Sequence, residues 1–382
     1  LQGAWARMHS QPPSFSAPAY SVLFTGAWPD LSDGPALNPE GEDVPAWTQD
    51  DLFSAAHRAG LKTAISGYIW FGGLVPQEAV DASFYTPGAD HRADLEVMAA
   101  ALPWLRSNSF QLVLIHLDQV DYAGHYEGGA LDPRWNESAR RVDDLLGEIV
   151  KQLDLRPESG QDALLVLSDH GHIDQGGHGG HEPVALVEPF LLVGAGVRPG
   201  SYPDVDMVDV APTLAALLGV SLPAASQGRV RTEMLDLPVE VEHALPQALK
   251  AQQEQLLRAY TAAIGRSAEP APGDDVVGAY QTALRSARQA RLNAGRLPRF
   301  ALALLAAILP LVWFWRQRRK EIGWFLSAGL LYLALFNLRY AVLDGRTYSL
   351  SSVNSADELI LFCAVTAAAA FLVSWLPFVL LR

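Results

Sequence analysis

The sequence has 382 residues, of which 49% are hydrophobic, and it carries a formal net charge of −14 at pH 7. This acidic balance argues against nucleic acid as a partner, although bound divalent cations can reverse the field locally and admit an anionic substrate. The single cysteine, Cys363, excludes an intramolecular disulfide.

The first part of the chain has the pattern of an α/β domain. The stretch TQDDLFSAAHRAGLKTAISGY (48–68) predicts a capped helix, a turn at Gly60 and a short strand. The mainly apolar runs at 110–115, 162–167 and 188–193 are typical of buried strands, and 136–153 predicts an amphipathic helix. This alternation predicts an α/β fold with a largely parallel central sheet flanked by helices.

The remainder of the chain predicts a linker and a membrane anchor. Residues 235–296 are rich in Ala, Gln, Glu and Arg and are interrupted by SAEPAPGDD, which predicts two helices joined by a flexible linker. Three apolar runs follow, Leu297–Trp315, Ile322–Leu343 and Leu359–Leu381. Each has about the ~20 residues that cross a bilayer. We therefore expect a globular domain at 1–234, a helical juxtamembrane linker at 235–296 and a membrane domain with three transmembrane helices at 297–382.

The charges around the first apolar run give two opposed signals for orientation. RQRRK at 316–320 favours a cytoplasmic loop and a globular domain outside, whereas the arginines that precede the run nearly cancel this bias. The loop at 344–358 is poor in basic residues and favours an outside location. We expect an integral membrane protein whose globular domain is extracytoplasmic.

Carboxylates and imidazoles gather after the first two of these predicted buried strands, 110–115 and 162–167, and in a Gly-rich loop. They are Asp121 and His125 in DYAGH, Asp169 and His170 in SDHG, and His178 and His181 in GGHGGH. Zinc and manganese bind such side chains, and in open α/β sheets ligands bind at the carboxyl ends of strands. One such pair alone is typical of a surface or capping pair, but the combination predicts a metal site.

A nucleophile is also needed, and Ser16 in SFSAPAYS is the candidate. Alone, a Ser/Pro/Ala turn of this kind is usually just a helix cap. A neighbouring metal would lower the pKa of its hydroxyl, and two ions ~3.5–4 Å apart stabilise both the attacking and the leaving oxygen of a displacement at phosphorus.

The segments SFSAPAYSVLFTG, VDYAGH, SDHGH…GGHGGH and VDVAPTLAALLGV, in this order, resemble the alkaline phosphatase superfamily. The resemblance extends over residues 12–229. It points to the type I phosphodiesterase/nucleotide pyrophosphatase and GPI ethanolamine-phosphate transferase branch. It implies two divalent metal ions, zinc or alternatively manganese, and hydrolysis or transfer of a phosphate ester through a phosphoserine. A lipid-linked or cell-surface substrate would suit the membrane tether.

The resemblance also assigns roles by position. Ser16 matches the nucleophile, Asp121 and His125 match one metal site with His178 as its third ligand, and Asp169 and His170 match the other site. His181 is the alternative third ligand. The neighbouring His172 is interpreted as a solvated loop residue.

Three departures leave alternatives open. The family supplies a metal-binding Asp upstream of the nucleophile, but the fifteen residues before Ser16 contain no acidic residue. Because the sequence starts at Leu1 rather than Met, we expect that Asp in a longer polypeptide. Ala19 stands where nucleotide pyrophosphatases have Asn, and Tyr20 stands where sulfatases require Arg. A sulfatase-like hydrolase and a non-catalytic membrane scaffold are the alternative functions.

Overall fold

The computed structural model of the chain divides into two compact units, Leu1–Tyr260 with Glu269–Ala283, and Thr261–Ala268 with Leu284–Arg382. The structure describes residues 3–31, 35, 37–39, 44–156, 160–318, 322–353 and 356–380. Leu381, at the end of the third predicted span, and Arg319 and Lys320 of the basic loop lie outside the described residues.

The first unit contains the strands. They are β1 (Gly3–His9), β2 (Thr63–Tyr68), β3 (Ala82–Thr86), β4 (Leu112–Ile115), β5 (Ala163–Leu167), β6 (Val187–Gly194), β7 (Gly200–Ser201) and β8 (Val205–Asp206). Its helices are α1 (Ser16–Thr25), α2 (Leu52–Arg58), α3 (Phe71–Leu74), α4 (His91–Ser107), α5 (Gln119–Tyr126), α6 (Pro133–Asp154) and α7 (Val210–Leu218).

The strands form two sheets, one of mixed direction and one parallel. One has the order β5-β6-β1-β7, with β8 also paired to β1, and the other has the order β3-β2-β4. The three-stranded sheet is parallel, whereas β6 runs antiparallel to both β1 and β5. The α/β class is confirmed, and parallel pairs predominate as expected, although the strands are not purely parallel.

The reversal between β5 and β6 has a local cause. Residues 168–186 connect the two strands, and their only described helical turn is the 3₁₀ segment Pro183–Ala185. Parallel neighbours need a crossover, usually a helix, whereas a loop without one allows the chain to fold back beside itself. The apolar pattern identified both strands correctly, but it carries no information on their direction.

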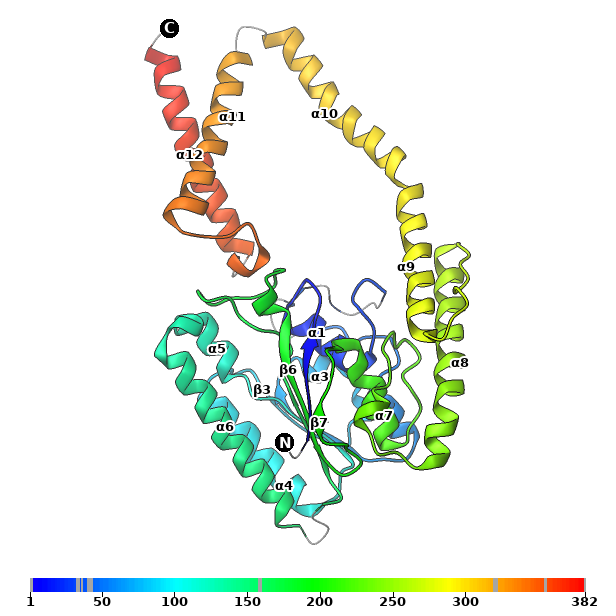
Figure 1. Cartoon of the computed structure of the whole chain (residues 1–382). Helices are drawn as coiled ribbons and strands as arrows, with labels where there is room; N and C mark the ends of the chain where they lie inside the picture. The colour runs from blue at the N-terminus through cyan, green and yellow to red at the C-terminus, as the bar shows by residue number, and fades with distance from the viewer. Residues whose placement is uncertain are drawn as a thin grey trace. The chain divides into compact units, whose positions relative to one another are not determined.

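Helices α4 and α6 lie on one side of the strands and α1 and α7 on the other (Figure 1). Hydrophobic clusters lie between the strands and these helices. Met98 of α4 and Leu145 and Ile149 of α6 belong to one cluster, against which Val113 of β4 and Leu164 of β5 pack. The larger cluster lies on the other face and contains residues of β1, β6, α1 and α7. Alternate residues of one strand therefore serve both clusters.

β4 and β5 are edge strands of the two described sheets. All four residues of β4 and four of the five residues of β5 are only half-buried, although both segments are apolar. Among the described residues, neither strand pairs on its outer side.

Helix α2 is preceded by a capping residue, as the sequence predicted. Asp51 caps α2 by accepting hydrogen bonds from the amides of Phe53 (2.8 Å) and Ser54 (3.0 Å). Within residues 235–296 the structure has two helices, α8 (Val239–Ile264) and α9 (Val276–Ala294).

The second unit contains α10 (Arg296–Arg318), α11 (Ile322–Asn337), a π-helical segment (Leu338–Leu343) and α12 (Ala356–Leu380). Three stretches of the described chain are long and apolar enough to cross a membrane: Val276–Gln317, Ile322–Leu343 and Asp357–Trp375. They contain or overlap the three predicted spans. Because these helices expose large apolar side chains along their length, the chain is an integral membrane protein.

Candidate active site

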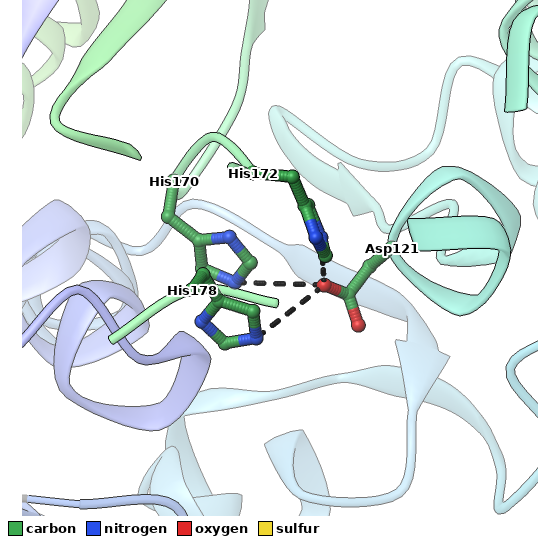
Figure 2. Close-up of side chains that lie close together, drawn as sticks. All are labelled: Asp121, His170, His172 and His178. Atoms are coloured by element: carbon green, nitrogen blue, oxygen red, sulfur yellow. Dashed lines mark hydrogen bonds and ion pairs between the residues drawn. The ribbon is translucent and has the colours of Figure 1, made fainter. Parts of the chain in front are cut away.

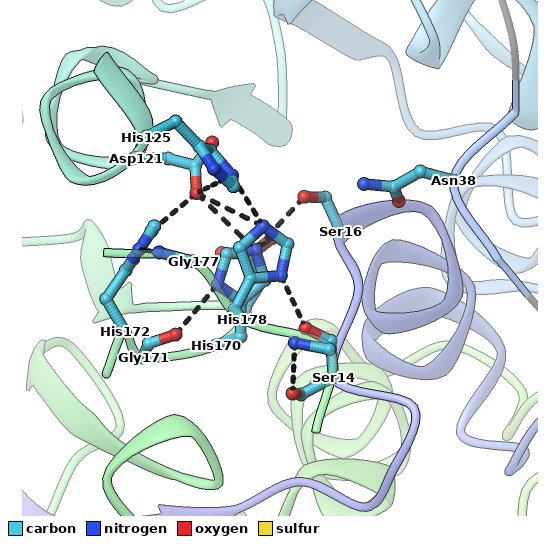
Figure 3. Close-up of polar contacts among 12 residues, drawn as sticks. Ser14, Ser16, Asn38, Asp121, His125, His170, Gly171, His172, Gly177 and His178 are labelled. Atoms are coloured by element: carbon cyan, nitrogen blue, oxygen red, sulfur yellow. Dashed lines mark hydrogen bonds and ion pairs between the residues drawn. The ribbon is translucent and has the colours of Figure 1, made fainter. Parts of the chain in front are cut away.

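A cluster of one carboxylate and four imidazoles lies between α5 and the loop after β5 (Figures 2 and 3). Asp121 and His125 are one turn apart on α5, so both project from the same helix face. The loop contributes the other imidazoles. They are His170, His172 and His178, and all three are buried.

Glycines allow this loop to approach α5. Gly176 has a φ of 84°, and a Cβ built on it would lie 1.9 Å from the carbonyl oxygen of Gly124. A Cβ on Gly124 would in turn lie 2.4 Å from Cε1 of His172. Only residues without a Cβ permit this contact, which brings the loop histidines within reach of Asp121.

Asp121, His125 and His178 form a group with the spacing of zinc ligands. Oδ1 of Asp121 lies 3.6 Å from Nε2 of His125 and 3.5 Å from Nε2 of His178, and the two Nε2 atoms are 2.9 Å apart. Ligand atoms ~2.0–2.1 Å from a tetrahedral zinc ion are separated by about 3.3 Å. The donor set and its spacing therefore fit a divalent ion.

The second ring nitrogen of His178 is held by the backbone. Its Nδ1 lies 2.7 Å from the carbonyl oxygen of Ser14, which fixes Nδ1 as the protonated donor and leaves the Nε2 lone pair directed to the cluster. Ser14 also accepts a hydrogen bond from the amide of Gly179 (2.9 Å). The Gly-rich loop is thereby joined to the segment that precedes α1.

Ser16, Asp169 and His170 form a second group. Nε2 of His170 lies 3.0 Å from Oγ of Ser16 and 3.3 Å from Oδ2 of Asp169. Nδ1 of His170 donates to the carbonyl oxygen of Gly171 (3.3 Å), so Nε2 is again the free ligand atom. Their carboxylate, imidazole and hydroxyl donors fit a second divalent ion.

Burial sets the charge of these groups. It lowers the pKa of His170 to about 4 and that of His178 to about 3, so both rings are neutral at pH 7 and available as ligands. Burial also raises the pKa of Asp169, with opposition from His116 and reinforcement from Asp121. A bound cation would relieve this repulsion between the carboxylates.

Burial raises the pKa of the Asp121 carboxyl as well, but the neighbouring imidazoles lower this pKa by more. The hydrogen bond from His172 and the imidazoles of His170, His178 and His125 hold the pKa of the Asp121 carboxyl below its usual range. Asp121 is therefore the anionic centre of the cluster.

The structure brings together all six residues singled out as nucleophile or ligands, Ser16, Asp121, His125, Asp169, His170 and His178. His181 is exposed and lies outside the cluster. Among the described residues, the side chains whose ligand atoms lie within 4.8 Å of one another are Asp121, His170, His172 and His178.

Two residues of this region were missed by sequence reasoning. His172 was interpreted as solvated but is only 7% exposed, and its Nε2 lies 2.6 Å from Oδ1 of Asp121. Asn38 accepts a hydrogen bond from the amide of Ala17 (3.0 Å), and Figure 3 shows its side chain directed toward Ser16. Asn38 lies in a Gly- and Pro-rich loop, where a lone Asn gives no signal.

Several known proteins are similar to this chain. Human GPI ethanolamine phosphate transferase 3, catalytic subunit, is 26% identical over 238 residues, which cover 60% of this chain and 21% of the relative. Human GPI ethanolamine phosphate transferase 2, catalytic subunit, is 27% identical over 231 residues, covering 57% of this chain and 23% of the relative. The chain thus spans about a fifth to a quarter of the length of these relatives.

A solved structure of human ectonucleotide pyrophosphatase/phosphodiesterase 5 superposes with a TM-score of 0.48 at 14% identity, covering 58% of this chain and 88% of that one. The family model for type I phosphodiesterase/nucleotide pyrophosphatase matches residues 1–255, two thirds of the sequence. The resemblance seen in the sequence motifs is confirmed, and the chain belongs to the type I phosphodiesterase/nucleotide pyrophosphatase family.

Proposed function

We propose that the chain is a membrane-anchored, metal-dependent phosphoesterase or phosphotransferase with Ser16 as its nucleophile. The observation that carries this proposal is the position of the Ser16 hydroxyl. It lies at the first residue of α1 and 3.0 Å from a neutral imidazole of the Asp/His cluster. The names of the relatives, ethanolamine phosphate transferases, support phosphoryl chemistry on a lipid-linked phosphate ester.

The chain's own residues supply the geometry of attack. The first turn of α1 has no acidic residue, so the positive end of the helix would favour a phosphate that approaches Ser16. The amide of Ala17 in this turn already donates to Asn38. The Ser16 oxygen would attack phosphorus as the bond to the ester oxygen breaks, which gives a phosphoserine; the hydroxyl proton passes to solvent and the leaving alkoxide takes a proton from solvent. Water or an alcohol would then take the phosphoryl group and regenerate the serine hydroxyl.

Divalent metal ions would be held in two groups, Asp121, His125 and His178 in one, and Asp169, His170 and Ser16 in the other. Zinc is the preferred ion, and manganese is the alternative. Bound metal would neutralise charge on the phosphoryl oxygens and lower the pKa of the serine hydroxyl. The upstream Asp of the family stays a prediction, as does the division at 234/235 and 296/297. The extracytoplasmic side of the catalytic domain is likewise a prediction.

The test uses the purified full chain in detergent, assayed with p-nitrophenyl phosphate, bis-p-nitrophenyl phosphate and p-nitrophenyl sulfate. Ser16→Ala should reduce metal-dependent turnover of the phosphate esters by about 10³-fold or more, as expected for loss of a nucleophile. Ser21→Ala is the matched control, because Ser21 is buried on the same helix and its hydroxyl has no hydrogen-bond partner among the described residues.

The other outcomes identify the alternatives. Unchanged phosphate ester turnover in Ser16→Ala would disprove the nucleophile. Turnover of the sulfate ester alone would favour the sulfatase-like hydrolase, although Tyr20 is buried and bonded to His116 where that class needs Arg. Stoichiometric metal with no turnover of any ester in the wild type would favour the non-catalytic scaffold.

A further inference from the structure

The second unit contains an arginine inside a membrane span whose charge is not matched by a nearby carboxylate. Arg339 lies in the π-helical segment, four residues before the end of the span Ile322–Leu343. Its Nη1 donates to Oγ1 of Thr366 (2.8 Å), and its guanidinium lies 4.3 Å from the ring centroid of Phe362. Among the described residues, no carboxylate lies within ion-pair distance of it.

Among the residues that the structure describes, the neighbouring Arg346 differs from Arg339 in having carboxylate partners. Arg346 is close to two carboxylates, with Nη2 2.5 Å from Oε1 of Glu358 and Nε 3.9 Å from Oδ2 of Asp344. Both arginines lie near the same α11–α12 end, since Arg346 also approaches the ring of Phe362 at 5.8 Å. One cation is therefore neutralised by the protein, and the other is not.

The contacts of Arg339 hold the guanidinium in place without neutralising it. Thr366 is fully buried, and its hydroxyl is fixed by its own donation to the carbonyl oxygen of Phe362 (2.7 Å). Only one of the five N–H donors of the guanidinium is used by these contacts. An unneutralised charge within a span is costly and marks a functional site, and π-helical segments occur frequently at such sites.

The depth of Arg339 in the membrane indicates which group neutralises its charge. Four residues correspond to about 6 Å of helix, so Arg339 lies near the boundary between hydrocarbon and headgroups. Tyr340 and Tyr348, whose rings stack 5.4 Å apart, mark the same boundary, where Tyr and Trp gather in membrane proteins. The anion found at this depth in every phospholipid bilayer is the phosphate group, and the planar fork of Arg matches it.

We propose that Arg339, held by Thr366 and Phe362, binds the phosphate group of a membrane phospholipid at the α11–α12 end. The proposal stands on the contacts of Arg339 and does not depend on the reaction at Ser16.

The test is native mass spectrometry of the full chain in detergent, titrated with phosphatidylglycerol or with diacylglycerol of the same acyl chains, which lacks only the phosphate headgroup. The wild type should retain phosphatidylglycerol and not diacylglycerol. Arg339→Gln should lose about tenfold in affinity for phosphatidylglycerol, the effect of losing a charge-assisted contact. Arg316→Gln, which removes an arginine beside the first span, is the matched control and should bind as the wild type does.

Thr366→Val is the second variant, because it keeps the charge and the volume but removes the hydroxyl that holds the guanidinium. It should lose about threefold in affinity. Each variant is judged only if it elutes as a folded, monodisperse protein. If such a variant, Arg339→Gln or Thr366→Val, binds phosphatidylglycerol as tightly as the wild type does, the proposal is overturned. Equal retention of diacylglycerol by the wild type would overturn it too, as would binding of inorganic phosphate without retention of the lipid.

Discussion

His172 donates through Nε2 to Oδ1 of Asp121 at 2.6 Å, while its Nδ1 accepts the amide hydrogen of Gly177 at 3.0 Å. The two hydrogen bonds fix the tautomer, because a neutral imidazole has one donor and one acceptor nitrogen. Neither nitrogen then has a lone pair free for a cation. His172 therefore orients the Asp121 carboxylate, although its distance alone would allow it to be a ligand.

This relationship predicts the behaviour of His172→Phe, which keeps a ring but loses the donor. The hydrogen bond lowers the pKa of Asp121, so its loss should raise that pKa and make protons compete with metal at a higher pH. We expect metal affinity at pH 7 to fall by about 10–100-fold, and the acid limb of metal binding to move to higher pH. Isothermal titration with zinc across pH 5–8 measures both quantities. An unchanged acid limb in a folded variant would contradict the positioning role.

The loop histidines provide a second, paired prediction. His178→Ala should lose metal, because it removes an imidazole that is 3.5 Å from Oδ1 of Asp121 and is held by Ser14. His181→Ala should retain metal, because His181 is exposed and lies outside the cluster. Inductively coupled plasma mass spectrometry on the purified variants gives the metal content, and the reverse result would make His181 the third ligand.

Gly124 tests the close approach between α5 and the loop. In Gly124→Ala the new Cβ would lie 2.4–2.9 Å from three ring atoms of His172, so the ring must move away from Asp121. We expect reduced metal affinity together with loss of about 1–3 kcal/mol of stability.

Gly147→Ala is the control for the glycine change. Gly147 lies on α6, where a Cβ would meet nothing within 4 Å. This change should stabilise the helix by about 0.5–1 kcal/mol and leave metal binding intact. Equal metal affinities in the two alanine variants would show that the loop tolerates a wider separation from α5.

Glu188 on β6 predicts how stability depends on pH. Its side chain is buried, Oε1 accepts a hydrogen bond from Ser10 (2.7 Å), and burial raises the pKa of Glu188 to about 8 from an ordinary value of 4.5. The folded state then holds a proton that the unfolded state releases above pH 4.5. The contribution of this group to stability therefore falls as pH rises from 4.5 to about 8 and is constant beyond that.

Glu188→Gln removes this titration. In chelator-treated protein we expect the variant to be more stable than the wild type at pH 8 by on the order of 3 kcal/mol, with the difference vanishing near pH 4.5. Denaturation of the full chain in detergent at several pH values measures the difference. A stability difference independent of pH would mean that Glu188 is ionised in the folded protein.

Much of the site could be predicted because its signals are local. Asp121 and His125 are four residues apart, a spacing that any helix converts into one face, and Asp169 and His170 directly follow an apolar strand. The role of His172 could not be predicted in this way. It depends on a loop path set by positive φ angles and by contact with a glycine on another helix, neither of which leaves a periodic signal.

The direction of β6 was unpredictable for a related reason. An apolar run records burial on both faces, and burial is the same for parallel and antiparallel neighbours. The membrane helices are the opposite case, because a span is defined by length and apolar composition alone, and the second predicted span coincides with Ile322–Leu343 in the structure.

The half-buried edge strands β4 and β5 also affect how the protein behaves in solution. Among the described residues neither strand pairs on its outer side, and an unpaired strand edge can template the addition of a further strand from another chain. We expect residues 1–382 to self-associate through these edges as their concentration rises, so that sedimentation coefficients increase with loading even in detergent that fully disperses the membrane helices.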